Sequence, residues 1–246
     1  MDFVISHFFH ILIPCIGGGL IQGMTGFGSG IFVMMFFPMF LPVLQSSALS
    51  TLNSISVSVP LAWRYRKHIR PRIIILPAIF YITAAFLALR FAVHADLTAL
   101  KSILGLFLMA VALYFLFVAG KLKIKASFWS ALICGTLAGV SSGLFGIGGP
   151  PMVIYILAIT GDDKEAYIAN SQFFFAVSMM FTTTMRVING IITPPLLLLV
   201  IPGILGMTIG KNIGIRIVEQ IDVEKMKKII YAFLFLSGLS TFLTNL

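Results

Sequence analysis

Two glycine-rich blocks carry the residues of this sequence that are best suited to binding chemistry. They read GLIQGMTGFGSG from Gly19 to Gly30 and GVSSGLFGIGGP from Gly139 to Pro150, an offset of 120 positions. Glycine breaks helices and lets a backbone amide approach a ligand closely. A half-helix that begins at such a break presents free N–H groups and a partial positive charge, which suit an anion. Matched breaks in two apolar halves are typical of a transporter's binding site.

Neutral hydrogen-bonding side chains, rather than carboxylates, accompany both blocks. A site of neutral donors can bind an oxyanion without a permanent salt bridge, which suits a solute that must also leave. We expect Gly28 and Gly148 to turn their amides toward this solute, while side-chain hydroxyls and amides complete its coordination. The predicted substrate-binding residues are Gln22, Thr25, Gly26, Gly28, Ser29, Asn53, Ser142, Gly146, Gly148, Gly149, Asn170, Ser171 and Gln172.

The same residues also have a purely structural interpretation. Small-xxx-small patterns commonly serve close helix packing in membranes, and packing is the interpretation we prefer for Gly19 and Gly139. Serine and threonine hydroxyls can bond to their own helix backbone instead of to a solute. For Gly26–Gly30 and Gly146–Pro150 we predict irregular backbone, because glycine this dense does not sustain a regular helix.

Composition indicates what must position these blocks. Of 246 residues, 59% are hydrophobic and 10% charged, whereas soluble domains carry about 25% charged residues. No charge occurs between Asp2 and Arg64, or between Lys125 and Asp162. Backbone in lipid must satisfy its own hydrogen bonds, and these runs lack the alternation of barrel strands, so we predict an all-α polytopic membrane protein. The net charge of +9 then reflects membrane topology rather than nucleic-acid binding.

The chain divides into two homologous repeats, residues 1–120 and 121–246, which we expect to form one integrated transmembrane domain. Arg90, Asp96, Lys101 and Phe107 reappear at an offset of 126 as Arg216, Asp222, Lys227 and Phe233. Each half has room for three ordinary transmembrane helices of about 20 residues. The uncharged run from Ala126 to Gly161 holds 36 residues, too few for two full spans and a turn, which need about 45. Each glycine block therefore predicts either a re-entrant hairpin or one long broken helix.

Loop charges favour the hairpin. If each glycine block crosses the membrane once, the repeats are parallel and nine basic residues face eight. If each block is re-entrant, the repeats are inverted and 14 basic residues face three, which are Arg90, Lys101 and Arg186. Basic residues collect on the cytoplasmic side, so we prefer inverted repeats with both termini outside. The hairpin tips would then meet near the midplane of the cell (inner) membrane.

Several single charges have simpler interpretations. Asp96 and Asp222 precede apolar runs and are predicted N-caps, and Asp162 with Glu165 predicts a capping box. Arg186 lies alone on the outer side. We interpret it as an end residue whose side chain snorkels to the membrane surface, with an outer anion contact as the alternative.

The sequence also argues against several classes of function. The spans contain essentially no carboxylate, which argues against a carboxylate-driven cation carrier and a membrane-embedded enzyme. Neither a P-loop nor a metal-ligand cluster occurs, and Cys15 and Cys134 are isolated, so we expect no cofactor, no metal and no nucleic-acid partner. A secondary transporter remains, with an uncoupled channel or uniporter as its alternative and a scaffold as a weaker one. Assembly into a homo-oligomer stays open.

The paired blocks GLIQGMTGFGSG and GVSSGLFGIGGP, each followed by an apolar stretch and a small-polar helix start, resemble the TauE/SafE sulfite exporter family, also called the toluene sulfonate uptake permease family. The resemblance covers both halves. It implies a multi-pass carrier for sulfite, sulfonates, sulfoacetate or related organic anions, with Gly26–Gly30 and Gly146–Pro150 near the substrate. Ser29 and Pro150 stand where the pattern usually continues with glycine, a departure that bears on local backbone and solute size.

Overall fold

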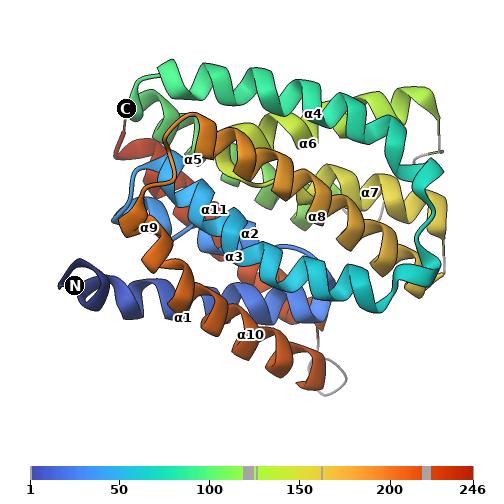
Figure 1. Ribbon diagram of the computed structural model, residues 1–246, viewed down its shortest axis with the longest axis horizontal. Helices are drawn as coiled ribbons and strands as arrows, with labels where there is room; N and C mark the ends of the chain where they lie inside the picture. Colours follow the sequence, from blue (N-terminus) through green and yellow to red (C-terminus); the bar gives the residue numbers. More distant parts are fainter. Residues whose placement is uncertain (1, 119–124, 126, 162, 218–222, 246) are drawn as a thin grey trace.

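The molecule is a bundle of helices. The computed structural model describes residues 2–118, 125, 127–161, 163–217 and 223–245, and every regular element within these ranges is helical. This agrees with the all-α class predicted from composition. The helices lie roughly side by side along the long axis of the molecule (Figure 1).

The N-terminal half begins with one long helix and one very short one, followed by three long helices. Its elements are α1 (Asp2–Thr25), α2 (Ser29–Val33), the 3-10 turn η1 (Phe37–Met39), α3 (Val43–Arg64), the 3-10 turn η2 (Arg66–His68), α4 (Pro71–His94), and α5 (Leu97–Leu113) with its π-helical end η3 (Tyr114–Val118).

The C-terminal half follows a similar order. Its elements are α6 (Phe128–Phe145), α7 (Gly149–Thr160), α8 (Lys164–Ile188), α9 (Pro194–Leu198), α10 (Val200–Ile217) and α11 (Val223–Leu243). In both halves the glycine block separates the first helix from the second.

Five helices of the described chain are long and apolar enough to cross a membrane. They are His7–Thr25, Pro71–His94, Leu97–Val118, Phe128–Phe145 and Pro194–Ile217. The chain is therefore a multi-pass membrane protein. Helices α3 and α8 have sufficient length but carry more polar residues, and most of these polar side chains are buried inside the bundle.

The chain reverses direction at each glycine block. After α2 and η1 it returns to the start of α1, because the Phe40 ring lies 5.9 Å from the His7 ring and 5.6 Å from the His10 ring. In the second half, Tyr155 of α7 belongs to the same buried cluster as Ala131 near the start of α6. Each block therefore lies between two successive helices that contact each other in the bundle.

Glycines hold two pairs of helices in backbone contact. A Cβ atom at Gly19 would meet the Met207 carbonyl, and one at Gly23 would lie 2.6 Å from the Lys211 carbonyl oxygen, so α1 and α10 run parallel. Gly139 packs in the same way against Tyr81, and Gly143 against Ala85, so α6 and α4 are also parallel. Packing is thus the role of Gly19 and Gly139, as predicted.

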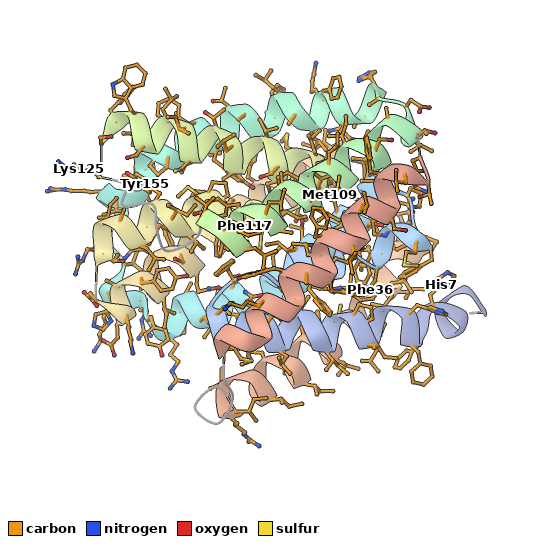
Figure 2. All side chains as sticks on the ribbon, turned by 180° about the vertical axis from the view of Figure 1, so that it is seen from behind. His7, Phe36, Met109, Phe117, Lys125 and Tyr155 are labelled. Atoms are coloured by element: carbon orange, nitrogen blue, oxygen red, sulfur yellow. The ribbon has the colours of Figure 1, made fainter. Side chains whose placement is uncertain are left out.

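The bundle has a basic end, where Arg64, Arg70 and Lys164 lie among neighbouring loops and helix ends. Lys125 lies at this end and His7 at the opposite one (Figure 2). Two ion pairs tie the loop after α3 to the start of α8: Arg70–Asp163 at 2.8 Å and His68–Glu165 at 3.0 Å.

Helix caps agree with the sequence at one position and differ at another. The carboxylate of Asp96 accepts hydrogen bonds from the Thr98 and Ala99 amides, at 2.9 and 3.1 Å, as an N-cap should. These two bonds, the one from Ala99 first, are the main cause of the lowered pKa of Asp96. The cap of α8 is Asp163, which accepts from the Ala166 amide at 3.0 Å, and not the predicted Asp162. Asp162 and Asp222 lie outside the described residues.

Candidate functional site

The first glycine turn, residues 26–28 between α1 and α2, depends on glycines with a left-handed backbone conformation. Helix α1 ends at Thr25, and φ is 81° at Gly26 and 96° at Gly28, values that side chains with a Cβ rarely adopt. The Thr25 hydroxyl lies 2.8 Å from the Ile21 carbonyl and 2.7 Å from the Phe27 carbonyl. Thr25 therefore stabilises the turn itself.

The second glycine turn, residues 146–148 between α6 and α7, has the same glycine spacing as the first but a different backbone geometry. Gly146 is left-handed, with φ of 72°, and its amide donates to the Ser142 carbonyl at 2.9 Å, which ends α6. Gly148 has an ordinary φ of −97°. A Cβ there would lie 3.1 Å from the Ala138 carbonyl and 3.2 Å from the Tyr81 ring, so close packing, rather than backbone conformation, disfavours a side chain at this position.

The two turns meet at one small cavity, which we call the central cavity. Its volume is about 40 Å³, and a Cβ on Gly30 would lie 3.3 Å from the Gly146 carbonyl, so the two turns nearly touch. The cavity is lined by Gln22, Phe27, Gly28, Ser29, Gly30, Ile31, Tyr81, Ser142, Gly146, Ile147, Gly148, Gly149, Phe175, Ser178 and Met179. Seven of the thirteen residues named from the sequence are therefore neighbours around one space, although they come from both halves of the chain.

The polar side chains of the central cavity are neutral. The Ser29 and Ser54 hydroxyls are 3.0 Å apart, and the Tyr81 hydroxyl donates to that of Ser142. The Gln22 amide nitrogen lies 3.4 Å from the Ser58 hydroxyl, while its buried oxygen has no partner. The lining thus offers hydroxyls, an amide and glycine backbone, and contains no carboxylate, histidine or metal-binding cluster.

A second, larger cavity opens at the basic end, and we call it the vestibule. It measures about 470 Å³, and Arg64 and Lys164 are among its lining residues. Thr25, Gly26 and Gln172, predicted as binding residues, line the vestibule rather than the central cavity, and Gln22 lines both. The Gln172 side chain donates to the Gly26 carbonyl, so it joins α8 to the first turn between the two spaces.

The three remaining predicted residues line neither cavity. The Asn53 amide packs against Gly203, with its nitrogen 3.5 Å from the Cys15 sulfur. Asn170 accepts from the Arg70 amide at 2.8 Å and donates to the His68 carbonyl at 3.2 Å. Ser171 is fully buried beside it. In this conformation Asn53 and Asn170 join helices and loops to one another.

The interpretation of Arg186 as a snorkelling end residue was wrong. Its side chain is fully buried, and its guanidinium donates to the Thr51 hydroxyl and to the Ser142 carbonyl, both at 2.9 Å. The end of a span looks the same in sequence whether the side chain points outward or inward. Here the rotation of α8 turns Arg186 toward the second glycine turn.

Several residues that line the central cavity were not among the binding residues predicted from the sequence. Phe175, Ser178 and Met179 line the cavity from α8 at spacings of three and four residues, the pattern of one helix face. The polar residues of α8 mark one face of this helix, and following that face along the sequence would have predicted these three positions. Tyr81 lies in an apolar run of α4, and nothing in its local sequence distinguishes it from a packing residue.

Comparison with known proteins adds the family. Residues 11–241, nearly the whole chain, match the family described as "Sulfite exporter TauE/SafE". The chain belongs to the TauE/SafE family. No curated protein and no solved structure matches it significantly.

TauE/SafE is a family of membrane transporters, and its description names sulfite export. The matched range includes both glycine turns, the central cavity and the vestibule.

Proposed function

We propose that this protein is a secondary transporter for a small oxyanion: sulfite, a sulfonate, sulfoacetate or a related sulfur-containing or organic anion. The observation that carries the proposal is the central cavity, where both glycine turns and neutral hydroxyl and amide groups surround one space. Hydroxyls and amides can donate to oxyanion oxygens from several directions. The solute would bind there and reach the two sides of the membrane by alternating access.

Helix dipoles support the proposal at one turn only. Helix α7 has 12 residues and begins with Gly149, Pro150, Pro151 and Met152, so among these four only Gly149 and Met152 have a backbone N–H that lacks an intrahelical partner. Helix α2 has five residues, too few for an appreciable dipole. We therefore assign the attraction for anions to α7 and to side chains, rather than to two equivalent half-helices.

Cavity size favours a small substrate within this class. A space of about 40 Å³ holds a few water-sized groups, since one water needs roughly 10–15 Å³ by the same measure. Sulfite has four heavy atoms, whereas an aryl sulfonate adds a ring that would need the bundle to open. We propose an inorganic oxyanion or a short aliphatic sulfonate.

For the membrane arrangement we propose two inverted repeats, residues 1–120 and 121–246, with the basic end in the cytoplasm and both termini outside. The equivalent helices α1 and α6 support it, because His7 of α1 and Lys125, just before α6, lie at opposite ends of the bundle (Figure 2). The equivalent helices α10 and α4 run parallel to α1 and α6, respectively. Helices α3 and α10 end, and α8 begins, at the vestibule. The vestibule would be the cytoplasmic entrance of a protein in the inner (cell) membrane.

An uncoupled uniporter or channel is the second candidate. It is favoured by the lining of the central cavity, which contains no aspartate, glutamate or histidine to carry a proton or bind sodium. Uptake into proteoliposomes with and without an imposed proton or sodium gradient separates the two. With the membrane potential held at zero, accumulation of solute above its external concentration requires coupling.

The purified protein should be melted in the presence of sulfite, sulfoacetate, toluenesulfonate and acetate, and uptake of the same solutes measured in proteoliposomes. We expect sulfite or sulfoacetate to raise the melting temperature and to be transported, because a ligand that binds only the folded state stabilises it. If no oxyanion stabilises the protein or crosses the membrane, the proposed function is wrong.

A further inference from the structure

Arg186 is a fully buried cation near the end of α8, at the side of the central cavity away from the vestibule. Its two terminal nitrogens donate to the Thr51 hydroxyl and the Ser142 carbonyl, both neutral groups. Its third nitrogen, Nε, is buried and has no hydrogen-bond partner. The guanidinium is therefore neither neutralised nor completely hydrogen-bonded.

No carboxylate pairs with this charge in the described part of the chain. The ion pairs there, His68–Glu165 and Arg70–Asp163, both lie on the exposed surface of the basic end. Burying an uncompensated guanidinium costs several kcal/mol. Ionisable residues inside membrane proteins are accordingly rare and mark functional sites whose partner needs to be identified.

A purely structural role accounts poorly for the arginine. The Ser142 carbonyl already accepts from the Gly146 amide at 2.9 Å, and the Thr51 hydroxyl already donates to the Ser47 carbonyl at 2.7 Å. Removing the guanidinium would leave neither partner without a hydrogen bond. The capping energy that a cation gives to the end of a helix such as α6 is smaller than the cost of burying it.

The position of Arg186 points to the central cavity as the location of its missing partner. It follows Met179 by seven residues, two helical turns, so both lie on the face of α8 that lines the cavity. Side chains on a helix lean toward its N-terminus, which here is toward the cavity. Ser142, whose carbonyl accepts from the guanidinium, itself lines that cavity. Ser142 thus separates the charge from the central cavity.

We propose that Arg186 is the fixed positive charge that makes the central cavity selective for anions, and that the transported oxyanion is its counter-ion. This proposal rests on the proposed function. The neutral groups of the lining contact the oxyanion, while the guanidinium attracts it from behind Ser142. Because the guanidinium donates to the Ser142 carbonyl rather than directly to the solute, the attraction does not lock the solute in a bidentate salt bridge.

The test compares Arg186→Met, Arg186→Lys and the control Arg90→Met, whose arginine is exposed on α4 over the Phe86 ring. Melting temperature is measured without solute and over a sulfite titration, with dimethyl sulfone as a neutral compound of similar shape. We expect Arg186→Met to melt at or above the wild-type temperature without sulfite, because it removes an unpaired buried charge. Its apparent affinity for sulfite should fall by about tenfold or more, with sulfite uptake falling in parallel.

Arg186→Lys keeps the charge and should retain sulfite-dependent stabilisation and uptake at reduced affinity. Arg90→Met should behave as wild type, and dimethyl sulfone should stabilise no variant. An Arg186→Met protein that is unstable without sulfite, yet binds sulfite with wild-type affinity, would show a structural cap and overturn the proposal. Failure of the wild-type protein to bind or transport any oxyanion would instead overturn the proposed function, and the role of Arg186 with it.

Discussion

Gly28 offers a direct test of whether the first turn must keep its backbone conformation for transport. Its φ is 96°, and a Cβ would lie 3.2 Å from the Ile21 side chain. Left-handed backbone costs an L-residue about 1–2 kcal/mol. Gly28→Ala should therefore either strain the folded protein by that amount or relax into a turn that moves the neighbouring Ser29 hydroxyl away from Ser54.

The matched control is Gly190→Ala. Gly190 also has a positive φ, 68°, but a Cβ there meets nothing within 4 Å, and the residue lies in the loop after α8. Both substitutions carry a similar conformational cost, whereas only Gly28 lines the central cavity. The pair separates an effect on the cavity from a general loss of stability.

The assay is thermal unfolding of the purified variants together with initial rates of sulfite uptake in proteoliposomes. A cost of 1–2 kcal/mol lowers the melting temperature by about 2–8 °C in a chain of this size. If strain is relieved by leaving the binding conformation, the same energy lowers uptake by Gly28→Ala about 5–30-fold, and Gly190→Ala should retain wild-type uptake. Equal uptake by Gly28→Ala and wild type, or equal losses in both variants, would refute the reasoning.

Three further predictions address the cavity wall, helix packing and pH. Gly149→Ala should keep the free energy of unfolding within about 0.5 kcal/mol of the wild-type value, because its Cβ would make only ordinary contacts with Phe27 and Phe175, at 3.8 and 3.9 Å. Since both rings line the central cavity, competition assays should show that this variant binds toluenesulfonate more weakly relative to sulfite than wild type does. Gly139→Leu should lower stability by about 1–3 kcal/mol, because a Cβ there already meets the Tyr81 carbonyl; thermal unfolding checks this, with Leu137→Ala on the exposed face of α6 as the control. Asp96→Ala should lower the melting temperature at neutral pH but not in acid: the pKa of Asp96 is lowered, so the cap is complete at neutral pH and is lost as the pH falls through that pKa. A difference between wild type and Asp96→Ala that persists unchanged in acid would contradict this.

The sequence predicted the helical class and the glycine packing because both depend on local properties. In lipid, a long apolar segment with few charges satisfies its backbone hydrogen bonds internally by forming a helix. Gly19 and Gly139 have spacing typical of close helix contacts, and the structure has them there. The two blocks also identified which segments meet, since Gly28, Ser29, Ser142 and Gly148 line one cavity.

Tertiary structure alone decided what surrounds that cavity. Asn53 and Asn170 are polar residues on buried helices, and only the rotation of α3 and α8 turns them toward other helices and loops instead of the cavity. The half-helix of α2 has only five residues, because the chain turns again at η1. Local sequence contains neither the rotation of a helix about its axis nor the point at which a neighbouring segment covers it.

Arg186 shows this division most clearly. The sequence determined that one arginine stands near the end of an apolar segment, and charge counting assigned that end to the outer side of the membrane. Whether the guanidinium points to lipid headgroups or into the bundle depends on which face of α8 is turned toward Thr51 of α3 and Ser142 of α6. That packing is set by side chains more than 40 positions away, so only the folded chain turns an ordinary end residue into a buried charge beside the central cavity.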